Sequence, residues 1–293
     1  MSPEFAAIAK GTKVALKRVG LIGFPVEHSL SPIMHNAAFK ALRMDDWHYD
    51  AMSIPPDILR LGLREPRDHG YIGINVTVPH KEAIMDYVRP DEKARAIGAV
   101  NTVDFRRNTG TNTDADGFIN DLRAHDVKIA AERVLVLGAG GAARAAVYGL
   151  VGAGAQVAIV NRTQSRAEAL VDHLRASAGI DGLRLMTLDE AADWGMSLIV
   201  NCTSVGLHPQ VDQSPWRHSL PFPAGLTVYD MVYRPAMTAL MRQCLAHDGR
   251  AIGGLGMLAR QGAISFELWT GVKPPIDLMQ RVLQDALGSA HKD

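Results

Sequence analysis

Short apolar runs alternate with stretches of helical periodicity along the first third of the chain. The runs predict strands over 19–23, 47–52, 71–76 and 99–105, and the periodic stretches predict helices over 32–42, 56–64 and 80–88. Strands and helices that alternate in this way form an α/β unit. The first third of the chain is therefore expected to fold around its own sheet.

A second α/β unit is predicted after a connecting helix over 116–124. A helix is predicted over 141–151, and strands are expected near Arg133, Gln156, Leu183, Ser197 and Thr227. Pro209, Pro215, Pro221 and Pro223 mark an irregular stretch in this unit. It is most simply a surface loop.

Two further helices are predicted near the C-terminus, over 254–269 and 276–287. The second unit already has its strands, so we expect these helices to pack back on the first. The predicted fold is thus two α/β domains, the second inserted into the first. The expected boundaries are 1–114, with 1–18 as a loose extension, then 115–252 and 253–293, and a ligand cleft is expected where the domains meet.

A glycine-rich turn, Gly138-Ala139-Gly140-Gly141-Ala142-Ala143, joins the predicted strand over 133–137 to the helix that follows. Glycines in this context allow a tight turn and let backbone amides approach a pyrophosphate at the helix N-terminus. An ordinary tight turn is the alternative. We interpret the turn as a dinucleotide site and take its first five residues, 138–142, as cofactor candidates. The proline-marked stretch could then also border the nicotinamide.

The next strand ends in Asn161-Arg162-Thr163, about 20 residues beyond the turn, where NAD-binding folds usually carry an acidic residue for the ribose. An arginine at this position favours NADP. Arg166 follows on the first turn of the next helix, so that two guanidinium groups could hold one 2′-phosphate, and Thr163 could cap that helix. The alternative is a capped surface helix whose arginines are merely solvated.

Composition excludes several classes of function for this 293-residue chain. Its 31 basic and 31 acidic residues leave no net charge, and no basic block suggests nucleic-acid binding. Cys202 and Cys244 are far apart, and the 11 histidines form no metal motif, so neither a disulfide nor a metal is expected. No stretch is long enough for a signal peptide or a membrane span. We expect a cytoplasmic protein, monomer or homodimer, whose partner is a small molecule.

Polar residues that could carry chemistry precede and follow the predicted strands of the first unit. In Ser29-Leu30-Ser31-Pro32, Ser31 is expected to cap a helix that starts at Pro32, or else the two hydroxyls could bind a small carboxylate. Asn75 and Thr77 point the same way at the end of a strand, where α/β domains bind ligands.

Lys81 is expected at the start of a helix, where the helix dipole disfavours an ammonium, and it could act as an acid or base. A solvated surface lysine is the alternative. Asn101 belongs to the next predicted strand. Asp114 could either cap the connecting helix or face Lys81 across the cleft, and in the second case its carboxylate would oppose the dipole effect.

The segments named above resemble those of the shikimate dehydrogenase family. The matching motifs are SLSP at 29–32, NVTVPHK at 75–81, GAVNT at 98–102, NTD at 112–114, GAGGAAR at 138–144, NRT at 161–163, YDMVY at 229–233 and GLGMLARQGA at 254–263. The resemblance spans roughly residues 19 to 285, and it agrees with an inserted cofactor domain.

The resemblance also implies residue roles. Ser29 and Ser31 would hold the substrate carboxylate, and Asn75, Thr77 and Asn101 would bind its ring hydroxyls. Tyr233 and Gln261 would make further substrate contacts. Lys81 and Asp114 would be the catalytic pair, and Gly254 would join the cofactor-binding residues. The implied reaction is the NADPH-dependent, reversible reduction of 3-dehydroshikimate to shikimate. Two alternatives are a quinate/shikimate dehydrogenase that uses NAD, disfavoured by Arg162, and a non-catalytic NADP-sensing module, disfavoured by the Lys81 and Asp114 pair.

Overall fold

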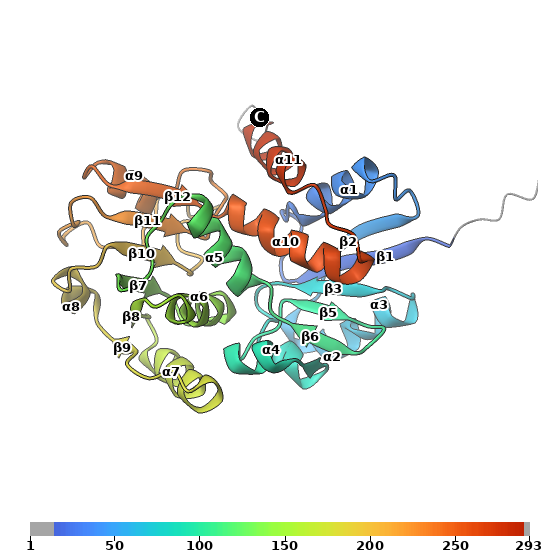
Figure 1. Cartoon of the computed structure of the whole chain (residues 1–293), viewed down its shortest axis with the longest axis horizontal. Coiled ribbons are helices and arrows are strands. Elements are labelled where there is room, and N and C mark those ends of the chain that lie inside the picture. Colours follow the sequence, from blue (N-terminus) through green and yellow to red (C-terminus); the bar gives the residue numbers. More distant parts are fainter. Residues whose placement is uncertain (1–14, 290–293) are drawn as a thin grey trace, which may run out of the picture.

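The computed structural model describes residues 15–289 and contains two six-stranded sheets, one in each half of the molecule (Figure 1). The first sheet has the order β2-β1-β3-β5-β6-β4, in which β5 runs antiparallel to both β3 and β6. Its strands are β1 (Lys17–Gly23), β2 (Trp47–Ser53), β3 (Gly73–Val76), β4 (Arg89–Pro90), β5 (Thr102–Asp104) and β6 (Thr109–Thr111). Helices α1 (Ser31–Ala41), α2 (Leu59–Gly62), α3 (Arg64–Asp68) and α4 (Glu92–Ile97) belong to the same half.

The second sheet is parallel throughout and has the order β12-β11-β10-β7-β8-β9. Its strands are β7 (Arg133–Leu137), β8 (Gln156–Val160), β9 (Arg184–Leu185), β10 (Leu198–Asn201), β11 (Thr227–Asp230) and β12 (Arg250–Gly253). Helices α6 (Gly141–Gly152), α7 (Gln164–Ala178), α8 (Leu188–Ala192) and α9 (Ala239–Leu245) accompany them. The strand order reverses between β7 and β10, which is the arrangement that binds dinucleotides. Neither β12 nor α9 was expected from the sequence.

Two long helices connect the halves. Helix α5 (Asp114–Ala124) packs on both α6 and α10 (Leu255–Thr270), while α10 and α11 (Ile276–Ser289) pack on α1 (Figure 1). The apolar face of α10 contributes Ala259 and Phe266 to the same core cluster as Met34 of α1. The prediction that the C-terminal helices return to the first half, which makes the second domain an insertion, is therefore confirmed.

Several local predictions were wrong. The helix expected over 80–88 is only a 3₁₀ turn, Ala83–Asp86, because the Lys81 carbonyl accepts a hydrogen bond from Val100 N (2.8 Å) and cannot continue a helix. The helix-dipole argument for Lys81 therefore has no basis. The strand expected over 99–105 shortens to β5, because the chain turns back to pair with β6.

Chain ends and caps also differ from expectation. Residues 1–18 were predicted to form a loose extension. Residues 1–14 lie outside the described residues, and Lys17 and Arg18 already belong to β1. Helix α1 begins one residue early: Leu30 takes the N-cap position, and Ser31 is the first helical residue with no capping bond. Its hydroxyl is therefore not needed by the helix end.

The crossing of α5 and α10 depends on glycine and on a buried carboxylate. A Cβ at Gly256 would overlap the carboxylate of Asp121, which is completely buried. Asp121 accepts hydrogen bonds from Tyr229 Oη (2.7 Å) on β11 and from Arg260 Nε (3.1 Å) on α10. One carboxylate thus joins three elements, and this anchors the connecting helices to the second sheet.

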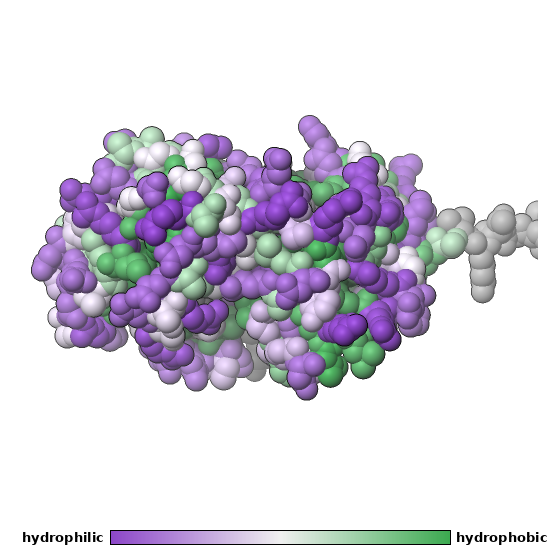
Figure 2. Space-filling view, turned by 90° about the horizontal axis from the view of Figure 1, so that it is seen from below, coloured by the Kyte–Doolittle hydropathy of each residue, from purple (hydrophilic) through white to green (hydrophobic). Residues whose placement is uncertain are grey.

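Polar side chains cover most of the face seen in Figure 2, with apolar residues scattered between them. Among residues 15–289, no helix is both long and apolar enough to cross a membrane.

Replacing Gly256 by alanine should lower the free energy of unfolding by about 1–3 kcal/mol, because the added methyl group forces α10 away from Asp121. Gly152→Ala is the matched control, because Gly152 also lies in a helix and an added Cβ there meets nothing within 4 Å. Its free energy of unfolding should stay the same or rise by up to about 1 kcal/mol. Urea unfolding of both variants measures the difference. Equal effects at the two positions would contradict the packing argument.

A second stability prediction concerns His35 of α1, which is fully buried and stacks on Tyr49 with a centroid distance of 4.3 Å. Neither ring nitrogen has a hydrogen-bond partner in the part of the chain that the structure describes. Burial therefore lowers the pKa of His35 from 6.5 to about 3.

Because the pKa of His35 is lower in the folded state, its contribution to stability is complete above pH 6.5 and is lost as the pH falls toward 3. Between pH 6.5 and 4.5 this loss should be about 2–3 kcal/mol. In His35→Leu, which cannot be protonated, the curve of unfolding free energy against pH should be flatter by that amount. Parallel curves for the two proteins would show that His35 does not titrate as inferred.

Candidate active site

A cavity of about 170 Å³ lies between the two domains, and all nine residues predicted to bind or transform a substrate line it. From the first domain and the returning helix these are Ser29, Ser31, Asn75, Thr77, Lys81, Asn101, Asp114 and Gln261; Tyr233, which follows β11, is the ninth. Ala142 of α6 and Met231 also reach the cavity. Segments far apart in the chain thus bring hydroxyl, amide and charged groups together in one small cavity.

Lys81 and Asp114 form an ion pair on the cavity wall, with Lys81 Nζ 2.7 Å from Asp114 Oδ2. Their side chains are 14% and 5% exposed. Of the two alternatives left open for Asp114, the structure shows the one in which it faces Lys81: Asp114 is the first residue of α5, and Thr113 occupies the N-cap position without a side-chain cap. A lysine held in this way can deliver a proton to a ligand in the cavity.

The second carboxylate oxygen of Asp114 is also bound. Asn101 Nδ2 donates to Asp114 Oδ1 (2.8 Å), while Asn101 Oδ1 accepts from Thr113 N (2.8 Å). Asn112 Oδ1 accepts from the backbone amide of Asp114 (3.0 Å). Asn101 therefore bonds both the backbone of Thr113 and the side chain of Asp114, and these bonds hold the Asp114 carboxylate toward Lys81.

Asn75 is buried, and its amide is already bonded within the protein. Its Nδ2 lies 3.0 Å from Ser265 Oγ and 3.1 Å from Thr102 Oγ1, and its Oδ1 accepts from Tyr49 Oη (2.8 Å). Sequence reasoning missed Tyr49, Thr102 and Ser265. Thr102 ends the GAVNT motif and the other two lie outside the named motifs, but none of them signals a role locally, because their proximity to Asn75 depends on how β2, β5 and α10 meet around β3.

The two serines of SLSP lie together at the start of α1. Ser29 Oγ accepts from the backbone amide of Ser31 (3.3 Å), and both side chains line the cavity. Tyr233 faces them from the second domain: burial raises the pKa of its phenol, and a hydrogen bond from Ser29 opposes that rise. Hydroxyl groups from both domains thus gather at this end of the cavity, which suits a carboxylate.

The glycine-rich turn has the geometry expected of a dinucleotide site. Gly138 has φ +114°, which L side chains rarely adopt, and at Gly140 an added Cβ would meet nothing within 4 Å, so the space in front of the backbone is open. Gly141 serves packing as well, since a Cβ there would lie 2.8 Å from Lys81 Cβ. The N-terminus of α6 is therefore brought directly against the lysine. Ala139 is buried, and Ala142 and Gly254 line the substrate-sized cavity.

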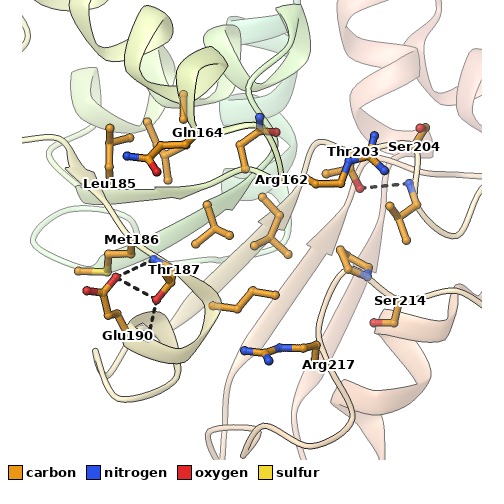
Figure 3. A pocket seen from close by; sticks show the side chains of 18 of the residues that line it. Arg162, Gln164, Leu185, Met186, Thr187, Glu190, Thr203, Ser204, Ser214 and Arg217 are labelled. Atoms are coloured by element: carbon orange, nitrogen blue, oxygen red, sulfur yellow. Dashed lines mark hydrogen bonds between the residues drawn. The ribbon is translucent and has the colours of Figure 1, made fainter.

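A larger pocket of about 930 Å³ lies at the carboxyl ends of the second sheet, near the reversal of strand order (Figure 3). Asn161 and Arg162 follow β8 and line it, together with Thr203. Figure 3 shows Arg162 and Thr203 on one side of the pocket, with Thr187 and Glu190 on the other. Its position and the arginine fit an adenosine phosphate.

The proline-marked stretch also lines this pocket, through residues such as Gln213, Pro215 and Arg217. The stretch contains no helix or strand and most of its residues are exposed or half-buried, so it is a surface loop as expected. The loop is nevertheless anchored, because Trp216 is 1% exposed and packs edge-on against Phe222 in the core on one side of the second sheet.

The remaining phosphate candidates are placed differently. Thr163 occupies the N-cap of α7 but makes no capping bond, while Asn161 Nδ2 donates to the Thr163 carbonyl (2.7 Å). Arg166 is absent from the residues that line the large pocket, and its Nη2 lies 3.8 Å from Glu82 Oε1. The structure therefore brings Asn161 and Arg162 to the pocket but directs Arg166 toward the first domain. Within residues 15–289, no cluster of three His, Cys, Asp or Glu could hold a metal ion.

Three family models match this chain. The shikimate dehydrogenase substrate binding domain matches residues 21–103, the shikimate/quinate 5-dehydrogenase model matches 122–205, and the shikimate 5′-dehydrogenase C-terminal domain matches 254–284.

Curated relatives and solved structures agree with these models. The NADP⁺-dependent shikimate dehydrogenase of Methanocella arvoryzae is 46% identical over 92% of this chain and 98% of its own length, and that of Methanopyrus kandleri is 42% identical over 92% and 95%. The structure of shikimate 5-dehydrogenase from Thermus thermophilus with NADP(H) and shikimate matches with a TM-score of 0.83 at 39% identity, covering 93% of this chain and 100% of that one. With its paired Lys81 and Asp114 in a cleft beside a dinucleotide fold, the chain belongs to the shikimate dehydrogenase family.

Proposed function

We propose that this protein catalyses the NADPH-dependent, reversible reduction of 3-dehydroshikimate to shikimate. The Lys81–Asp114 pair carries the proposal, because it places a proton donor in a small polar cavity directly against the N-terminus of α6. The relatives named above as NADP⁺-dependent shikimate dehydrogenases support it.

Substrate would be oriented from opposite ends of the cavity. Ser29 and Ser31 would bind the carboxylate, with Tyr233 beside them, and Thr77 and Gln261 would bind ring hydroxyls. Asn75 and Asn101 were also predicted to bind the ring hydroxyls. Because their amides are already bonded within the protein, we assign them chiefly the role of holding neighbouring groups in place.

The proton step follows from the ion pair. NADPH, when bound, supplies the hydride that reduces the ring carbonyl carbon. Lys81 Nζ would donate a proton to the carbonyl oxygen as negative charge develops there, and in the reverse direction it would accept the proton from the hydroxyl. Asp114 keeps the ammonium aimed at the cavity, and Asn101 keeps Asp114 in place. Positioning of the reacting groups within the cavity would contribute much of the rate enhancement.

The cofactor would lie along the carboxyl edge of the second sheet. Residues 138–142 would bind the pyrophosphate at the N-terminus of α6, Gly254 would border the nicotinamide end, and Asn161, Arg162, Thr163 and Arg166 would surround the 2′-phosphate.

We also propose the domain division 1–114, 115–252 and 253–293. We further propose a cytoplasmic location, and the free thiols of Cys202 and Cys244 support this location.

The function is tested by assaying shikimate and quinate with NADP⁺ and NAD⁺ in all four combinations. We expect shikimate with NADP⁺ to give the highest kcat/KM.

Arg162→Ala should raise the KM for NADP⁺ about ten- to a hundredfold, because a charge-assisted bond to the 2′-phosphate is lost, and should leave the KM for NAD⁺ nearly unchanged. Preference for quinate with NAD⁺, or absence of turnover in all combinations, would overturn the proposal.

A second test separates proton transfer from substrate binding. Lys81→Ala should lower kcat by about 10²- to 10⁴-fold with little change in the KM for shikimate, because the lysine acts mainly in the transition state. Ser29→Ala, in the same cavity, should instead raise the KM for shikimate through loss of a carboxylate contact. A Lys81→Ala variant with near-normal turnover would remove the lysine from the mechanism, and an unaltered KM in Ser29→Ala would remove the serine from the carboxylate site.

A further inference from the structure

Glu82, the residue after Lys81, is held by two arginines of the second domain. Its Oε2 lies 3.2 Å from Arg144 Nε on α6, and its Oε1 lies 3.8 Å from Arg166 Nη2 on α7. One carboxylate of the first domain thus contacts two helices of the cofactor domain. Glu82 itself lies just outside the sequence motifs named above.

The two arginines are held with different strength. The side chain of Arg144 is 10% exposed, so the negative charge of Glu82 compensates a buried guanidinium. The side chain of Arg166 is 61% exposed, and an ion pair in that setting contributes at most about 1 kcal/mol. Arg144 Nε makes no hydrogen bond within the described residues, so Arg144 attracts Glu82 by charge alone, and Arg166 can exchange Glu82 for another anion at little cost.

In the proposed cofactor complex, the 2′-phosphate beside Arg162 would be a second anion for Arg166. Arg166 lies in the first turn of α7, four residues after Arg162, which precedes the helix and lines the large pocket. Arg166 points toward Glu82 of the first domain and does not line the pocket that Arg162 lines, so turning its guanidinium to a phosphate in that pocket would give up the 3.8 Å contact with Glu82.

Building on the proposed binding of NADP, we propose that Glu82 competes with the 2′-phosphate for Arg166 and thereby sets how strongly this protein prefers a phosphorylated ribose. Glu82 would then be a specificity-determining residue that contacts neither the substrate nor the reacting atoms. Its position next to Lys81 means that the cofactor phosphate and the segment that carries the lysine share one guanidinium.

Calorimetric titration with adenosine 2′,5′-bisphosphate and with 5′-AMP tests the competition without relying on turnover. Glu82→Gln keeps an oxygen for Arg144 but removes the charge that attracts Arg166. It should tighten binding of the bisphosphate about two- to fivefold and leave 5′-AMP unchanged. Glu92→Gln, which removes a carboxylate at the start of α4 in the same domain, is the matched control and should change neither.

A double-mutant cycle assigns the effect to Arg166. In an Arg166→Gln background, Glu82→Gln should no longer alter the affinity for the bisphosphate. Glu82→Asp, whose carboxylate is withdrawn by one methylene, should shift the affinity in the same direction as Glu82→Gln if the latter folds poorly. No change in either Glu82 variant, or the same change with Arg166 absent, would overturn the competition.

The wild-type titration separates this inference from the proposed function. If the wild-type protein binds the bisphosphate no more tightly than 5′-AMP, the NADP assignment itself falls, and the role of Glu82 falls with it. If the wild-type protein discriminates but the Glu82 variants do not differ from it, only the competition is refuted.

Discussion

The ion pair between Lys81 and Asp114 is the interaction on which the site depends, because it joins the loop after β3 to the first residue of α5. Moving two charges out of water is unfavourable unless further bonds hold them. Asn101 provides such a bond to the free carboxylate oxygen. The pair therefore has one geometry, and the lysine is presented to the cavity rather than to solvent.

Two glycines allow the helices around the ion pair to approach each other closely, so that a cofactor and a substrate can both reach it. Gly141 lets the N-terminus of α6 touch the stem of Lys81, and Gly117 lets α5 touch Gln261 on α10, where a Cβ would lie 2.8 Å from Gln261 Cβ. Larger residues would push the domains apart at the points where hydride and proton must meet. The small size of these residues is thus a requirement of the cleft as much as of the turns.

Several contacts between the domains near the site are polar. Glu82 meets Arg144 and Arg166, and His173 Nε2 lies 3.0 Å from the carbonyl of Arg95. The large apolar clusters lie within each half and along the connecting helices, and one small cluster crosses between the halves, with Ile97 and Ala99 of the first domain packed against Ala145 of α6. Polar contacts can be exchanged for bonds to a ligand or to water with a small change in free energy, whereas separated apolar surfaces cannot. The cleft is therefore the part of the fold best suited to respond to bound anions.

The sequence by itself determined the alternation of strands and helices, the inserted second domain and the glycine-rich turn, because hydrophobic period and glycine position are local properties. It also determined which residues could carry chemistry, and the cavity gathers Ser29, Lys81 and Asp114 as expected. Only the tertiary structure decided how they are held. The short turn after Lys81, the bonding of Asn75 by Tyr49, and the direction of Arg166 toward Glu82 all depend on neighbours distant in sequence. Local pattern cannot encode such contacts, since they exist only once both sheets and the α5–α10 crossing are in place.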